Sequence, residues 1–181
     1  MSKPKTAGEV KLIMSVFSAD RDRLNGALEA LSGQYGSADF ISAFMPFEFT
    51  QYYHGEMGGP LARRFIAFEK LARPESLPDI KILTNGMEER FALGGVRRVN
   101  IDPGYISPAH LILATGKGYT HRPYLRDGIY ADLTLVYRAG AFHALPWTYP
   151  DYAAVEVREM LQRIRAKYIA QLKPSAHRDG S

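Results

Sequence analysis

The order of hydrophobic periodicities in the N-terminal half is the feature that most constrains this chain. Val10–Ser18 is a nearly unbroken apolar run, which is typical of a buried strand. Leucines at helical spacing follow, and Asp39–Phe44 and Arg64–Leu71 are then predicted as two further strands. A second helical stripe precedes a short strand at Arg97–Ile101. This order of elements predicts a ferredoxin-like βαββαβ core, in which helices cover one face of an antiparallel sheet.

The C-terminal half predicts additional sheet and a final helix. Ile129–Arg138 alternates between two sets of side chains, and Gly140 turns the chain back into Ala141–Leu145. An apolar stripe at helical spacing begins near Asp151. We therefore expect an α+β fold, with a β-hairpin and a C-terminal helix added to the ferredoxin-like core. One domain would span residues 10–172, between flexible ends at 1–9 and 173–181.

The net charge of the chain is concentrated at its two ends. The 23 Lys and Arg residues outnumber the 19 Asp and Glu residues, which gives +4 over 181 residues. Residues 9–172 keep 19 basic and 18 acidic side chains, so the body of the chain is almost neutral. This balance weighs against a nucleic-acid-binding protein and leaves only a local basic patch to support one.

The chain lacks the residues and segments that mark several other classes of protein. It has no cysteine, which excludes disulfide bonds, thiol nucleophiles and cysteine-based metal sites. Residues 1–9 lack the apolar segment of a secretory signal, and no apolar run approaches the roughly 18 residues that cross a bilayer. We expect a cytoplasmic protein that does not associate with a membrane.

Common enzyme motifs are also missing. Lys117 lies between two glycines, but the segment lacks the spacing of a phosphate-binding loop. The five histidines show no metal-ligand spacing, so no metal site is expected, and the sequence leaves the cofactor unknown.

The first of three polar clusters lies in an aromatic segment rich in glycine. Tyr52 and Tyr53 offer flat stacking faces, and Glu56 beside His54 could transfer a proton or bind a hydroxyl group. The same aromatic residues also suit a loop that seals the edge of the core.

The second cluster precedes an Asp-Pro-Gly sequence. On a strand, Arg98, Asn100 and Asp102 would project from one face and Arg97 from the other. A guanidinium, an amide and a carboxylate in one row suit ligand binding, although Asp-Pro-Gly is also typical of a turn. On the preceding helix, a polar row has the pattern of a solvated face: Lys81, Asn85 and Glu88.

The third cluster combines cations, a histidine and phenols. Lys117 and Arg122 could hold an anion, and Tyr124 could contact the same ligand. Asp132 could orient His121 as a general acid or base. A loop held only by an Arg122–Asp132 ion pair explains the same residues equally well.

Six motifs together resemble one known family. They are Phe49-Thr50-x-Tyr52-Tyr53-x-x-Glu56-Met57-Gly58, Lys81-x-x-Thr84-Asn85, Arg98-x-Asn100-x-Asp102-Pro103-Gly104-Tyr105, His121-Arg122-x-Tyr124-Leu125, Gly128-Ile129-Tyr130-Ala131 and Trp147-Thr148-Tyr149-Pro150-Asp151-Tyr152. The resemblance is to a bacterial family named domain of unknown function 4416, and it extends from Val10 to the last helix. It implies no established activity that could be transferred to this chain.

Two hypotheses about function follow. The first is a site for a small anionic ligand, phosphorylated or nucleotide-like, whose enzymatic form would use His121 as the acid or base with Asp132 orienting it. Its other parts are an anion clamp (Lys117, Arg98, Arg122), hydroxyl or Mg²⁺ ligands (Asn100, Asp102) and a stacking tyrosine (Tyr52 or Tyr53). The alternative is a non-catalytic RNA-binding or protein-interaction module. The sequence leaves the oligomeric state open.

Overall fold

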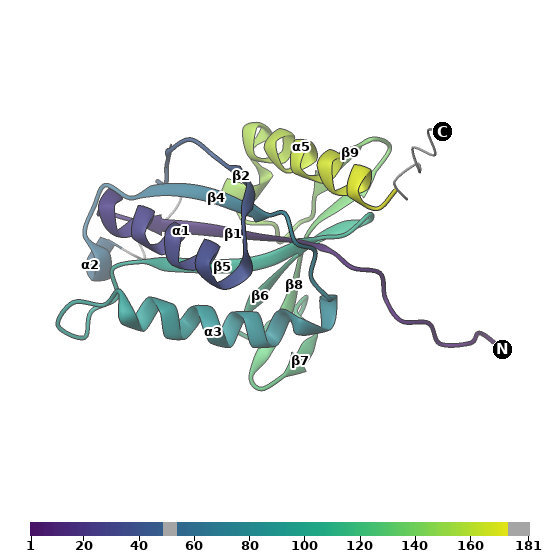
Figure 1. Ribbon diagram of the computed structural model, residues 1–181, viewed down its shortest axis with the longest axis horizontal. Helices are drawn as coiled ribbons and strands as arrows, with labels where there is room; N and C mark the ends of the chain where they lie inside the picture. The colour runs from purple at the N-terminus through teal and green to yellow at the C-terminus, as the bar shows by residue number, and fades with distance from the viewer. Residues whose placement is uncertain (49–53, 174–181) are drawn as a thin grey trace, which may run out of the picture.

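The computed structural model describes residues 1–48 and 54–173. These residues form one antiparallel sheet of nine strands with helices on both faces (Figure 1). The strand order is β2-β4-β1-β5-β6-β8-β7, with β3 beside β4 and β9 beside β8. The strands are β1 (Lys11–Ser18), β2 (Ala38–Ile41), β3 (Met45–Pro46), β4 (Ala62–Phe68), β5 (Asn100–Ile106), β6 (His110–Thr115), β7 (Tyr124–Arg126), β8 (Ile129–Arg138) and β9 (Ala141–Ala144).

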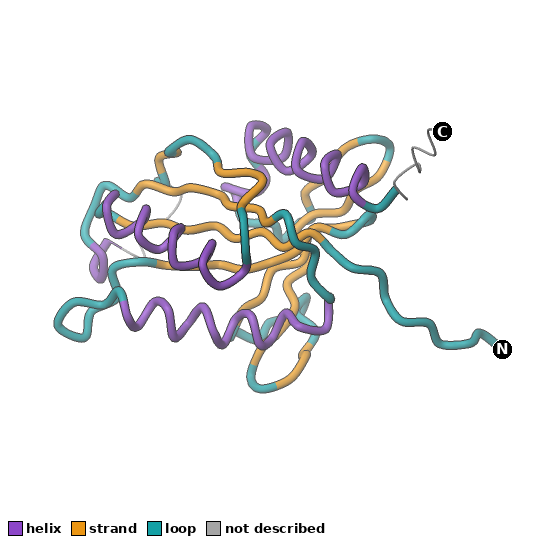
Figure 2. Tube along the Cα trace, viewed as in Figure 1, coloured by secondary structure: helices purple, strands orange, loops and turns teal. Residues whose placement is uncertain are grey.

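Three long helices cover the sheet in two layers. Helices α1 (Arg21–Tyr35) and α3 (Leu77–Arg90) pack on one face, and α5 (Val155–Gln171) packs on the other (Figure 2). The shorter elements are α2 (His54–Met57), the 3₁₀ turn η1 (Pro74–Ser76) and α4 (Pro150–Ala153). Within the described residues, no helix is both long and apolar enough to span a membrane.

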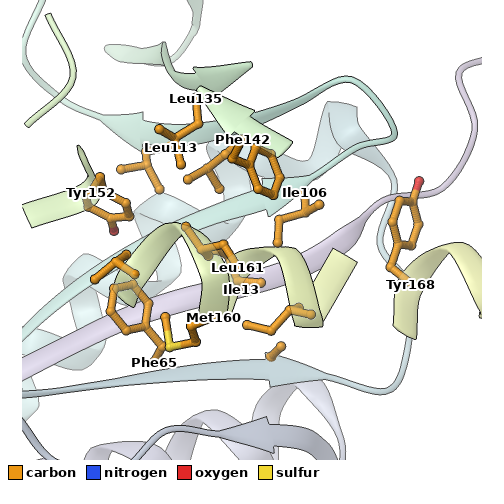
Figure 3. Packing of buried hydrophobic residues seen from close by; sticks show 14 residues of the cluster. Ile13, Phe65, Ile106, Leu113, Leu135, Phe142, Tyr152, Met160, Leu161 and Tyr168 are labelled. Carbon is orange, nitrogen blue, oxygen red and sulfur yellow. The ribbon is translucent and has the colours of Figure 1, made fainter. Parts of the chain in front are cut away.

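The strand β1 is buried along its whole length because it lies between β4 and β5. Its side chains alternate between the two layers. Met14 packs with the residues beneath α1 and α3, and Ile13 packs in the cluster beneath α5 (Figure 3). Burial on both faces is the physical reason for the nearly unbroken apolar run in this part of the sequence.

The predicted α+β class with an antiparallel sheet is confirmed, and some boundaries differ. The strand β8 has the predicted bounds, Ile129–Arg138. The strand β5 begins at Asn100 rather than Arg97, and the last helix begins at Val155, after the separate short helix α4. The sheet is also larger than a core with one added hairpin, because β6, β7, β8 and β9 all extend it beyond β5.

The sheet splits between β5 and β6. The strand β5 pairs with β1 along its length but with β6 only over Gly104–Ile106. At Gly104 the two strands approach so closely that a Cβ atom would overlap the Ile112 carbonyl oxygen and lie 2.6 Å from Leu113 Cδ2. Before this point β6 diverges, and among the described residues the first half of β5 has no partner strand on that side.

We predict that Gly104→Ala destabilises the fold by more than about 2 kcal/mol, because the added methyl group meets backbone that cannot yield without breaking the β5–β6 pairing. Urea unfolding followed by the fluorescence of the single tryptophan measures this.

The matched control is Gly86→Ala in the middle of α3, where a Cβ atom meets nothing. That variant should gain about 0.5–1 kcal/mol, because alanine favours the helix. Equal stabilities for the two variants would show that the close approach at Gly104 does not hold the strands together.

Candidate functional site

A cleft of about 610 Å³ lies where β5 and β6 diverge, a volume suited to a small-molecule ligand. Its lining comes from β1, β4, α3, β5, β6, β8 and α4, and from loops next to these elements. Nine charged side chains of the described residues line it: Arg63, Lys81, Glu88, Arg97, Asp102, Lys117, Arg122, Asp132 and Asp151. The fold therefore brings parts of the second and third predicted clusters together.

Side chains of α3 complete the open edge of β5. Glu88 Oε1 accepts a hydrogen bond from the Ile101 amide at 2.7 Å, and Lys81 Nζ donates to the Ile101 carbonyl at 3.0 Å. Lys81 Nζ also lies 3.7 Å from Asp102 Oδ1. Lys81 and Glu88 are both buried, so the expectation of a solvated polar face is wrong for these two residues, whereas Asn85 is exposed as expected. Buried backbone amide and carbonyl groups at an open strand edge need hydrogen-bond partners, and these polar side chains supply them.

A chain of hydrogen bonds runs along the wall formed by β5. Arg97 donates from Nη2 to Glu56 at 2.8 Å and from Nη1 to Asn100 at 2.9 Å. Asn100 in turn donates to Asp102 Oδ2 at 2.7 Å. Arg97, Asn100 and Asp102 line the cleft, and Glu56, on α2, supports Arg97 from outside the lining.

Arg98 does not line the cleft. It borders a separate hollow with Ser18 and Asp20, so the expected pairing of Arg98 with Asn100 and Asp102 on one face is wrong. The physical reason is that β5 begins only at Asn100, and the alternation of side chains in a strand does not extend back to Arg98.

The third predicted cluster forms the opposite wall. Arg122 donates from Nε to Asp132 at 2.7 Å, from Nη2 to Tyr149 at 2.8 Å and from Nη1 to the Lys117 carbonyl at 3.1 Å. All four residues line the cleft. The guanidinium is therefore fixed in position by three contacts, and Lys117 stands on the exposed rim beside it.

His121 lies behind this wall. Its Nε2 is 3.5 Å from Asp132 Oδ2, and its ring stacks on Trp147 with centroids 5.1 Å apart and an interplanar angle of 16°. It is not among the residues that line the cleft. The predicted contact between His121 and Asp132 is thus present, but the imidazole reaches the cleft only through Asp132.

Tyr124, another predicted ligand-binding residue, does not contribute to the lining. Tyr124 is exposed and packs edge-to-face against Tyr130 outside the cleft. Tyr52 and Tyr53 lie outside the described residues. In the part of the chain that the structure describes, no three acidic or histidine side chains gather as metal ligands.

The buried end of the cleft contains residues that the sequence analysis missed. Arg63 forms an ion pair with Asp151, and both side chains are nearly inaccessible. Its guanidinium lies 4.6 Å from the ring centre of Phe65 and 5.7 Å from that of Tyr152. The sequence signal was that Arg63 lies two positions before Phe65, so both side chains would share one face of the strand. The predicted strand began at Arg64 and therefore did not include Arg63.

Fold and site together define an antiparallel α+β protein whose divided sheet holds a polar, ligand-sized cleft. The model of the family described as domain of unknown function (DUF4416) matches residues 8–168, and the chain belongs to this family. Searches among curated proteins and among solved structures gave no match.

We predict that Glu88 makes stability depend on pH. Burial raises the pKa of Glu88, and the Lys81 charge and the Ile101 amide only partly oppose this. The folded protein therefore holds the proton to higher pH than the unfolded chain. This contribution to stability is fully present below the unfolded-state pKa, about 4.3, and is lost as the pH rises through the folded-state pKa.

The test compares wild type with Glu88→Gln, which cannot ionise but keeps an oxygen that can accept from Ile101. The free energy of unfolding of the wild type should fall relative to the variant as the pH rises. Urea titrations between pH 4 and about 8 measure the difference. Glu89→Gln, on the exposed neighbouring residue, serves as the control. A Glu88→Gln difference that stays constant or moves in the opposite direction with pH would contradict the prediction.

Proposed function

We propose that the protein binds a small anionic ligand, phosphorylated or nucleotide-like, in the cleft between β5 and β6. The observation that carries this proposal is the charge of the lining. Five cationic side chains and four carboxylates from separate segments converge on this one small cleft. Cations held by hydrogen bonds around a concave surface are the usual means of binding phosphate or carboxylate groups.

Lys117 and Arg122 are the proposed anion clamp. Arg122 is held by Asp132, Tyr149 and the Lys117 carbonyl, so little side-chain entropy is lost when it binds a ligand. Asn100 and Asp102, on the opposite wall, would bind ligand hydroxyl groups. Arg97 takes the place proposed for Arg98, because it is the arginine that lines the cleft beside Asn100.

An enzymatic role would place His121 as a positioning residue. Because the imidazole contacts Asp132 and does not line the cleft, any proton it holds reaches the ligand only through that carboxylate. We therefore favour binding over catalysis.

We also propose that part of the fold is a ferredoxin-like unit. The order β2-β4-β1-β5, antiparallel pairing between all neighbours, and α1 and α3 on one face support this.

The test is a thermal-unfolding panel of nucleoside mono-, di- and triphosphates and sugar phosphates, each with and without Mg²⁺. A ligand at about 100 times its Kd stabilises the folded state by about 2.7 kcal/mol, which raises the midpoint clearly. The shift should be lost in Arg122→Gln and reduced in Lys117→Gln, because both cations line the cleft.

The matched control is Arg126→Gln. Arg126 is an exposed arginine on β7 that pairs with Asp79 and Asp127 away from the cleft. Its variant should keep the full ligand shift. If no compound of the panel raises the wild-type midpoint, the proposed function is wrong.

Single-stranded RNA is the second candidate ligand. Tyr119, Trp147 and Tyr149 are large exposed aromatic residues close to Arg122 and His121, and such surfaces stack on bases. Short RNA that quenches Trp147 fluorescence, with an affinity that falls steeply with salt, would favour this function over the small-molecule site.

A further inference from the structure

We propose that the buried end of the cleft receives an uncharged flat ring that carries a carbonyl oxygen next to an N–H group. This inference rests on the proposed function, because it specifies which part of a nucleotide-like ligand enters the cleft furthest. The anionic part would then remain at the rim beside Lys117 and Arg122.

The first argument is that hydrogen-bond donors at this end are unsatisfied. Tyr152 is 4% exposed and Arg63 is 1% exposed, and both line the cleft. Neither the Tyr152 hydroxyl nor Arg63 Nε has a hydrogen-bond partner among the described residues. Buried donors without a partner are costly, and native structures usually satisfy them. An oxygen atom of a ligand placed between these two groups would accept from both.

The Ser15 hydroxyl is a third polar group at this position. It lies on β1 opposite Asp102 and interacts with the Tyr152 hydroxyl closely enough to lower the pKa of Tyr152. The two hydroxyls nevertheless do not meet the geometry of a hydrogen bond with each other or with another described residue. Its side chain is 1% exposed. Two of these polar groups, on Arg63 and Tyr152, line the cleft, and Ser15 lies behind them. Their unmet hydrogen bonds indicate that a polar group belongs at this end.

The second argument is that this end carries no net positive charge. Arg63 is compensated by Asp151, and Lys81 by Asp102. Burial raises the pKa of the Tyr152 hydroxyl, and the Asp102 and Asp151 charges raise it further. The Arg63 charge and the interaction with the Ser15 hydroxyl oppose this rise only in part. Tyr152 therefore stays a neutral donor. A second charged oxyanion would be repelled by two carboxylates, whereas a neutral carbonyl would not.

The same carboxylates give the neighbouring N–H group its partner. Asp102 and Asp151 both line the cleft and can only accept hydrogen bonds when ionised. A carbonyl oxygen facing Tyr152 and Arg63, with an adjacent N–H facing a carboxylate, satisfies both sets of groups together. A lactam or a cyclic imide presents this arrangement on one edge.

The third argument is the shape of the walls. Phe17 and Phe47 stack with ring centres 4.5 Å apart and an interplanar angle of 22°, and both line the cleft. Tyr152 adds a third ring to the lining. Aromatic walls beside a few placed polar groups favour a flat ring over a branched or highly hydrated group.

The experiment uses uridine and inosine, which are uncharged nucleosides with a carbonyl next to an N–H group. Both are added to the full-length protein at up to about 10 mM, and affinity is measured from the rise in thermal midpoint. We expect at least one to bind.

Tyr152→Phe, which removes only the hydroxyl, should weaken that affinity roughly three- to tenfold, the effect of one hydrogen bond. Without a ligand, Tyr152→Phe should be as stable as wild type or more so, because the hydroxyl is unpaired.

Two other tyrosines are matched controls. Tyr168, at the opposite end of the same core cluster, donates to the Glu9 carbonyl at 2.8 Å (Figure 3). Tyr168→Phe should lower the thermal midpoint without changing nucleoside affinity. The Tyr35 hydroxyl has no hydrogen-bond partner within the described part of the chain, and it lies beside the core beneath α1, away from the cleft. Tyr35→Phe should change neither quantity.

The ligand offers a control that needs no variant. In 3-methyluridine and 1-methylinosine a methyl group replaces the N–H hydrogen, so both should bind to the wild type at least tenfold more weakly than their parents, because the methyl group would meet a buried carboxylate.

Several outcomes would overturn the inference. The inference is wrong if neither nucleoside raises the thermal midpoint. It is also wrong if Tyr152→Phe keeps the full ligand shift, or if the methylated nucleosides bind as tightly as their parents. A loss of stability in unliganded Tyr152→Phe equal to that of Tyr168→Phe would show that the hydroxyl is satisfied within the protein, for example by a buried water.

The same measurements separate this inference from the proposed function. If ribose 5-phosphate binds only when Lys117 is present and no nucleoside binds, the anion site is supported and the ring site is rejected. If nucleosides bind as tightly as their monophosphates and Lys117→Gln has no effect on affinity, the ring site is supported and the anion site is rejected.

Discussion

The open edge of β5 at Ile101 is the constraint on which the site depends. A buried strand cannot leave its amide and carbonyl unpaired, and β6 has already diverged at this point. Lys81 and Glu88 of α3 therefore replace the missing strand. This substitution holds the sheet open, fixes α3 against β5, and places an ammonium and a carboxylate in the wall of a cleft. The point of divergence is set by Gly104, where the strands touch too closely for any side chain.

The charges of the cleft form a connected network. Glu88 accepts from Ile101 and contacts Arg97, which also binds Glu56 and Asn100. Each buried charge is thereby compensated, as removal of ions from water requires. Because the side chains already hold one another, the cleft keeps its shape without a ligand, and a ligand would have to match existing positions rather than induce them.

The sequence predicted elements whose pattern is local and missed residues whose role is set by contacts across the fold. The alternation in β8 and the leucines of α1 predicted these elements correctly, because the repeating apolar side chains there are the ones that are buried. Arg97 and Arg98 were assigned to the wrong faces, because that assignment depends on where the strand begins. Lys81 and Glu88 resembled a solvated row because the gap that they fill exists only after β5 and β6 have separated.

The two ends of the cleft differ in chemistry, and this difference would orient a ligand. At the rim, Lys117 is exposed and Arg122 is fixed in position by Asp132 and Tyr149, so an anion bound there would remain partly solvated. At the buried end, Arg63 is compensated by Asp151 among aromatic rings, and the unmet hydrogen bonds belong to groups that prefer a neutral acceptor. A molecule that is charged at one end and flat and uncharged at the other can enter in only one direction. The divided sheet thus gives the cleft a polarity because one end lies deep between its layers and the other opens beside the loop that follows β6.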